Sequence, residues 1–235
     1  MKKIAVLRLL ERYPLFTLND FVKLTGKKVQ DSRNYLYRLQ KEGLVFRIER
    51  GKYTVFDDPM IFSSHIIVPS YISFWTAIRL YNFTEQLPSD IMIATARPKK
   101  GTIFQGTRIR FFKTRHMWGY SKQRHGSFDM FIADREKCII DCMLIKNTPF
   151  DEVAKAIRQK EIDKKKLAEY ALKTGNVSLM KRIGFMLQKI SGFHAEGLIK
   201  RLDNNHITLD WSHGKKGKKD KIWKIVINRN LDDIT

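Results

Sequence analysis

Side chains that can donate hydrogen bonds to a polyanion are concentrated between residues 27 and 52. They are basic, amide or hydroxyl groups, and the set is Lys27, Lys28, Gln30, Ser32, Arg33, Tyr37, Arg38, Arg47, Arg50 and Lys52. Arginine can donate two hydrogen bonds to guanine, and glutamine can pair with adenine in the same way. Arg33 and Gln30 are therefore the candidates for reading base edges.

The remaining members of this set suit contacts with phosphates. Lys27, Lys28 and Arg38 carry positive charges, and Tyr37 can donate through its hydroxyl. Arg47, Arg50 and Lys52 lie farther along the chain, around a turn that contains Gly51, and are placed for the backbone or the minor groove.

The elements around these residues predict a winged helix-turn-helix. Thr17 is the expected N-cap of a short helix, with Asp20 three residues later in a capping box, and Gly26 makes the turn. A longer helix with Val29, Leu36 and Leu39 facing inward then runs to Gly43. Its amino-terminal end carries Lys27 to Arg33, and this is the end that usually approaches base edges. Strands over 44–49 and 52–56 form the wing.

Charge points to the same class of partner. The 235 residues include 45 Lys and Arg against 24 Asp and Glu, which gives a formal net charge of +21 and an isoelectric point near 10.0. Such an excess favours polyanions. No apolar run approaches 18 residues, so we expect no segment that spans a membrane. No long helix gathers its Lys and Arg opposite a broad apolar face, so we expect no membrane partner and a cytoplasmic protein.

The rest of the chain predicts an α+β protein with two domains, 1–57 and 58–235. Residues 71–81 have helical spacing, and short runs at 91–95, 103–104, 107–112 and 127–132 predict a small, mainly antiparallel sheet packed on that helix. A helical part is expected over about 134–190, including three helices after residue 150. Strands at 207–211 and 221–228 are expected to form a hairpin, at about 205–230, around the basic tip 213–221.

Enzyme chemistry finds little support in the sequence. Cys138 and Cys142 are too few for a zinc site and predict two small buried side chains. Gly126-Ser127 resembles the opening of a nucleotidyltransferase motif, but no Asp-x-Asp pair follows it to hold two metal ions. A nuclease that uses Asp129, Asp134 and Lys137 is a further alternative. We expect a non-enzymatic protein without cofactor or metal.

The order of several segments resembles the AbiEi family, antitoxins and transcriptional regulators of abortive-infection toxin–antitoxin operons. The resemblance covers about residues 3–190. The segments that carry it are RIERGKYTV, PSYISFWTAIRLYNFTEQLP, GTRIRFFK, IADREKCIIDCML, LAEYALKTGN and LMKRIGFMLQ.

This resemblance implies a protein of two parts. The winged helix would bind operator repeats in double-stranded DNA and repress its own operon, with residues 27–38 and 47–52 matching the DNA-binding elements. The carboxy-terminal domain would counter a nucleotidyltransferase-type toxin without a stable complex. An RNA-binding regulator unrelated to toxin–antitoxin control is the alternative, since the charge favours any nucleic acid.

Overall fold

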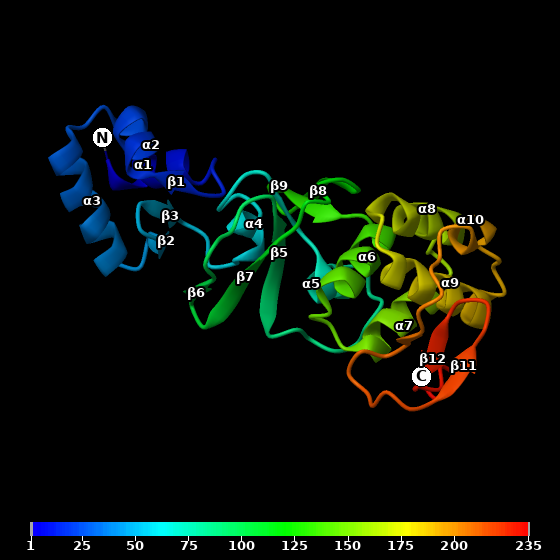
Figure 1. Cartoon of the computed structure of the whole chain (residues 1–235). Helices are drawn as coiled ribbons and strands as arrows, with labels where there is room; N and C mark the ends of the chain where they lie inside the picture. Colours follow the sequence, from blue (N-terminus) through cyan, green and yellow to red (C-terminus); the bar gives the residue numbers. More distant parts are fainter. Residues whose placement is uncertain (1, 235) are drawn as a thin grey trace. The chain divides into compact units, whose positions relative to one another are not determined.

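The computed structural model describes residues 2–234, and the chain is mixed α+β, with helices and several sheets (Figure 1). It divides into two compact units. The first contains Met1–Ile72, Ser89–Met117 and Ser121–Ile132, and the second contains Ser73–Pro88, Trp118–Tyr120 and Ala133–Thr235. The expected boundary after residue 57 stays a prediction.

The amino-terminal module of the first unit has three helices and a small sheet of order β1-β3-β2. Its elements are α1 Lys3–Leu10, β1 Phe16–Thr17, α2 Leu18–Thr25, α3 Val29–Lys41, β2 Phe46–Glu49 and β3 Lys52–Thr54. The strands of the β2–β3 hairpin pair antiparallel, and β1 pairs with β3. This order of elements is helix-turn-helix-like and agrees with the pattern expected from the sequence.

An apolar core holds the three helices together. It is formed by the buried side chains Val6, Leu10, Phe16, Phe21, Leu36, Leu39 and Val45. Each fully buried side chain of this size contributes about 1.5–3 kcal/mol to the free energy of folding, because its apolar surface is removed from water. The position of α3 is thus set by packing and does not depend on a ligand.

The remaining elements of the first unit are a short helix and a six-stranded sheet of order β6-β7-β5-β4-β9-β8. They are α4 Met60–Ser63, β4 Ser70–Ile72, β5 Asp90–Thr95, β6 Thr102–Phe104, β7 Thr107–Lys113, β8 Tyr120–His125 and β9 Phe128–Ala133. The last residue of β9 and the first of β8 are assigned to the second unit.

The sheet is mixed, with two parallel strand pairs where the sequence predicted a mainly antiparallel sheet. Strands β5 and β7 pair in parallel, as do β4 and β9, while β4–β5 and β6–β7 are antiparallel. The chain leaves β5, forms β6 at the edge, and turns back at Gln105-Gly106, where both residues have positive φ. The returning strand β7 inserts between β6 and β5, and its direction there is parallel to β5.

The helix expected over residues 71–81 begins later than its spacing suggested. Ser70–Ile72 is strand β4, and helix α5 covers only Phe74–Leu80. Ser73 between them is extended, and Ile72 pairs with Ile93 and Ile132. A short apolar run does not distinguish a buried strand from a buried helix, and here pairing with neighbouring strands decides.

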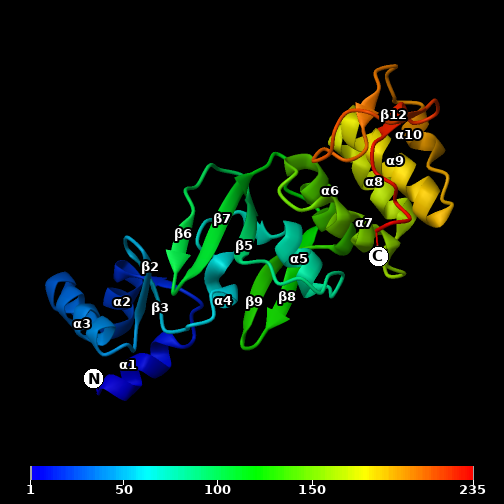
Figure 2. The same ribbon diagram turned by 90° about the horizontal axis from the view of Figure 1, so that it is seen from below.

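Helices dominate the second unit. They are α5, α6 Arg135–Ile145, α7 Phe150–Arg158, α8 Lys164–Thr174, α9 Val177–Ser191 and α10 Glu196–Ile199. Asp134, Asp163 and Asn176 cap α6, α8 and α9 through their side chains. Helices α8, α9 and α10 lie side by side in Figures 1 and 2. The prediction of three helices between residues 150 and 190 is confirmed. Cys138 and Cys142 are buried as expected, and neither forms a disulfide.

The carboxy-terminal strands do not form the hairpin that the sequence predicted. A three-stranded sheet of order β10-β12-β11 contains β10 Ile207–Thr208, β11 Lys218–Asp220 and β12 Ile225–Ile227. The two predicted strands, now β10 and β12, pair in parallel and are not hairpin partners. Part of the basic stretch expected as a loop is itself β11, and it pairs antiparallel with β12.

We predict that Gly184→Ala destabilises the second unit. Gly184 lies inside α9, and a Cβ built there would be 1.9 Å from Cζ3 of the buried Trp223. The Trp223 indole would have to move to avoid this steric clash. We therefore expect the free energy of unfolding to fall by about 1–3 kcal/mol, as urea denaturation measures. The control is Gly197→Ala in α10, where a Cβ meets nothing within 4 Å. It should leave stability unchanged or raise it, and equal losses for both variants would contradict this packing.

Candidate nucleic-acid interface

Helix α2, which precedes α3, has well-defined ends. The Thr17 hydroxyl accepts from Asp20 N at 3.2 Å, and Asp20 Oδ2 accepts from Thr17 N at 2.8 Å. These reciprocal bonds form the expected capping box. Gly26 ends α2 with φ 68°, a left-handed conformation that most residues adopt at a cost. The chain therefore changes direction sharply between the two helices.

The buried and exposed faces of α3 are clearly separated. Leu36 and Leu39 are buried, as expected. Gln30, Arg33 and Tyr37 are exposed at successive helical turns, and they form one stripe because residues three or four apart share a helix face. The outward face thus presents an amide, a guanidinium and a phenol in line.

The predicted contact residues differ in how accessible they are. Seven are exposed, namely Lys28, Gln30, Arg33, Tyr37, Arg38, Arg47 and Arg50; Lys27 and Lys52 are partly buried, and Ser32 is buried. Lys27 and Arg38 both lie over the Tyr35 ring, at 5.4 and 5.6 Å from its centroid. These cation–π contacts keep both charges close to the surface of α3.

Two positions on α3 face the opposite way from the prediction. Ser32 has no solvent exposure, and its hydroxyl has no hydrogen-bond partner among the described residues. Val29, expected to face inward, is 46% exposed. Val29 is the first residue of α3, where the core beneath the helix has ended, whereas Ser32 lies one turn before Leu36 on the buried face.

Exposed side chains on the same face were not singled out from the sequence. Asn34 follows Arg33, and Lys41 lies one turn after Tyr37 with its ammonium 5.6 Å from the Tyr37 ring centroid. An asparagine can pair with adenine as a glutamine does. Repeated steps of three or four residues along the helix from Gln30 lead to both positions.

The turn end of the β2–β3 hairpin is fixed by Glu49. Its carboxylate lies 2.9 Å from Lys52 Nζ and 2.6 Å from Lys99 Nζ. Burial raises the pKa of Glu49, but the hydrogen bonds from Lys99 and Lys52 outweigh burial and the net pKa is lowered. Lys52 also donates to the carbonyl of Ile66. Lys52 is thus engaged inside the first unit, while Arg50 at the turn is exposed.

We predict that Ser32→Ala changes neither duplex binding nor folding. The variant removes a buried hydroxyl without a partner, so stability should stay equal or rise, within about 1 kcal/mol. Thermal unfolding and a duplex titration test this. A tenfold weaker binding with unchanged stability would restore Ser32 as a contact residue.

The residues considered for catalysis have structural partners. Asp129 lies 3.5 Å from Arg124 and 3.8 Å from Lys122 in the β8–β9 hairpin. Asp134 caps α6 and accepts from the Tyr170 hydroxyl at 2.8 Å. Within residues 2–234, no three His, Cys, Asp or Glu side chains are grouped so that they could hold a metal ion.

No helix within residues 2–234 is long and apolar enough to cross a membrane.

The packed helix pair, the exposed stripe of Gln30, Arg33 and Tyr37 on α3, and the hairpin define a module of the kind found in transcriptional regulators. Residues 5–55 match the model of a family described as transcriptional regulator, AbiEi antitoxin. The chain thus carries an AbiEi-type regulator module at its amino terminus, which confirms the resemblance over this segment. A search of curated proteins gave no match.

Proposed function

We propose that this protein is an antitoxin that represses its own operon by binding operator repeats in duplex DNA through a winged helix-turn-helix. The exposed stripe of Gln30, Arg33 and Tyr37 on a helix fixed by a buried core carries this proposal. The family match over residues 5–55 supports it.

In this proposal α3 enters the major groove. Arg33, Gln30 and the neighbouring Asn34 read base edges, because their donors and acceptors match those of guanine and adenine. Lys28, Arg38 and Tyr37 contact phosphates beside them. Lys27 adds positive charge near Tyr35, and Ser32 does not take part.

The hairpin contacts the neighbouring backbone or minor groove. Arg50 and Arg47 are exposed on it and supply the positive charges. Lys52 acts indirectly, since its ammonium is held by Glu49 and by the Ile66 carbonyl and thereby fixes the hairpin. Phosphate contacts of this kind add affinity that falls as salt rises.

The carboxy-terminal unit supplies the antitoxin activity, and the resemblance to the AbiEi family supports this part. The protein counters a nucleotidyltransferase-type toxin without a stable complex, and has no catalytic role of its own. The test is co-expression with a nucleotidyltransferase encoded beside it. We expect the Arg33→Ala variant, which no longer represses, to rescue growth. Failure of the wild type to rescue growth would contradict the antitoxin role.

A reporter gene placed behind the protein's own upstream DNA tests repression. Wild type should lower expression, and Arg33→Ala should not. Titrations with duplex DNA, duplex RNA and single-stranded RNA of one sequence address the alternative function. A preference for RNA would favour the RNA-binding regulator.

A further inference from the structure

A cationic hollow lies in the second unit. Its volume is about 480 Å³, and its lining includes Lys146, Arg182, His206 and Lys215. No carboxylate is among its lining residues. Two lysines and one arginine therefore line one space without a carboxylate on its wall.

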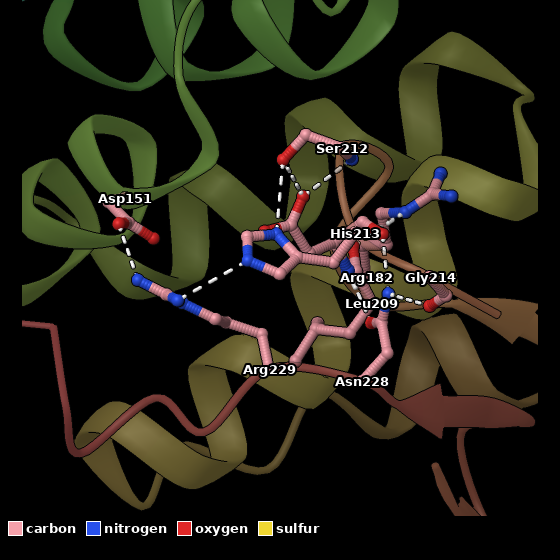
Figure 3. A network of polar contacts seen from close by, with 9 residues as sticks. Asp151, Arg182, Leu209, Ser212, His213, Gly214, Asn228 and Arg229 are labelled. Carbon is pink, nitrogen blue, oxygen red and sulfur yellow. Dashed lines mark hydrogen bonds and ion pairs between the residues drawn. The ribbon is translucent and has the colours of Figure 1, made fainter. Parts of the chain in front are cut away.

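Arg182 is the most deeply placed of these groups. It is only 6% exposed, and its Nε donates to the carbonyls of Thr208 at 3.0 Å and Leu209 at 3.1 Å. Figure 3 shows the bond to Leu209, and the two terminal nitrogens lie beyond it. Among residues 2–234 the only hydrogen bonds of the Arg182 side chain are those of Nε, and its guanidinium carbon lies 5.9 Å from the Trp211 ring centroid. A buried guanidinium normally uses its planar fork on a carboxylate or phosphate.

Lys146 is held beside Arg182 by the backbone. It caps the carboxyl end of α6 with φ 58°, a conformation uncommon for a lysine. Burial, and then the charge of Arg182, lower the pKa of Lys146. Two cations close together repel each other when no carboxylate lies on the wall. A bound anion would offset this repulsion.

The acid that acts electrostatically on Arg182 has other partners. Asp210, which acts electrostatically on Arg182, accepts from Ser212 N at 2.7 Å and from the Ser212 hydroxyl at 2.6 Å. His213 Nδ1 lies 2.7 Å from its other oxygen (Figure 3). Arg229 continues this network to Asp151 at 2.7 Å. Asp210 therefore does not supply the partner for the Arg182 Nη atoms.

We propose that this hollow binds the phosphate group of a small molecule, with Arg182 and Lys146 as its main ligands. Two free Nη donors match two oxygens of a tetrahedral anion, and Lys146 and Lys215 balance the charge of a dianion. The Ser178 hydroxyl, in the first turn of α9, adds a donor on the same wall. The inference goes beyond operator binding and does not depend on it.

The size of the hollow favours a phosphate ester over free phosphate. Its volume is in the range of small-molecule sites, and Ile207 and Val226 form an apolar part of the wall. An uncharged organic portion fits there while the phosphate meets the cations.

Calorimetric titration of the full chain with inorganic phosphate, AMP and adenosine at constant ionic strength tests the site. We expect phosphate and AMP to bind and adenosine not to bind. A lower Kd for AMP than for phosphate identifies an ester, and equal Kd values identify free phosphate. The double variant Lys146→Gln/Lys215→Gln should weaken AMP binding roughly tenfold or more, as expected when charge-assisted hydrogen bonds are removed.

The matched control is Lys189→Gln/Lys200→Gln, which removes the same charge from exposed lysines that do not line the hollow. It should bind AMP as wild type does, and both doubles should unfold at similar temperatures without ligand. Equal weakening in both doubles, or no binding of phosphate and AMP to wild type, would overturn the site. Binding only of an oligonucleotide without terminal phosphates would also overturn it, in favour of a backbone-contacting surface.

Discussion

Arg33→Ala is expected to weaken binding to the operator duplex by about 1–3 kcal/mol, one to two powers of ten in Kd. Arg33 is exposed in the middle of the outward stripe on α3, between Gln30 and Tyr37. Its removal takes away a bidentate base contact and leaves the guanine acceptors unpaired. The reduction in affinity should therefore be larger on the operator than on unrelated DNA, as a titration of both duplexes measures.

Removing Arg50 as well tests the hairpin. The Arg33→Ala/Arg50→Ala variant should bind both duplexes still more weakly, and the slope of log K against log salt should become shallower by about 0.9 for each phosphate that the variant no longer binds. The control is Arg12→Ala, an exposed arginine that lies before α2. An unchanged slope in the double variant, or equally weakened binding in the control, would contradict the assigned contacts.

Lys137→Met should be the most destabilising single change that we predict, at about 3–5 kcal/mol of unfolding free energy. Lys137 is fully buried in α6, where its ammonium forms an ion pair with the buried Asp141. The Ser73 hydroxyl donates to the same carboxylate at 2.7 Å, and the Trp118 ring centroid lies 4.8 Å from Lys137 Nζ. Burial lowers the pKa of Lys137 and Asp141 opposes this. The variant would leave Asp141 as a buried charge without its counterion.

The double variant Lys137→Met/Asp141→Leu separates the ion pair from simple packing. Replacing both charges with apolar side chains removes the unpaired charge, so much of the stability should return. Urea denaturation of the wild type, Lys137→Met, Asp141→Leu and the double variant gives the coupling free energy. A destabilisation below about 1 kcal/mol for Lys137→Met alone would show that the carboxylate finds another partner.

The amino-terminal module was largely predictable because its signals are local. Thr17 and Asp20 form the cap, Gly26 adopts the left-handed turn, and Leu36 and Leu39 face the core as their spacing indicated. The same spacing failed at Ser32 and Val29. A buried serine and an exposed valine run against side-chain polarity, and only the packing around α3 decides them.

The rest of the fold depends on pairing between distant segments, which local patterns do not carry. Residues 70–72 form a strand because β5 and β9 lie on either side of it. The parallel pairs β5–β7 and β10–β12 follow from strands inserted between others. The role of Glu49 at the turn end of the hairpin likewise needs Lys99, fifty residues later in the chain. Arg182 lies in a segment that carries the family resemblance, but only the structure shows that its hydrogen bonds to the chain are made by Nε alone.

The most direct test of the account is footprinting of the protein on the DNA upstream of its own gene. Wild type should protect repeated sites there, Arg33→Ala should fail to protect them at the same concentration, and Arg12→Ala should retain the protection. The same footprint for wild type and Arg33→Ala, or no protected repeat at all, would contradict operator reading by α3.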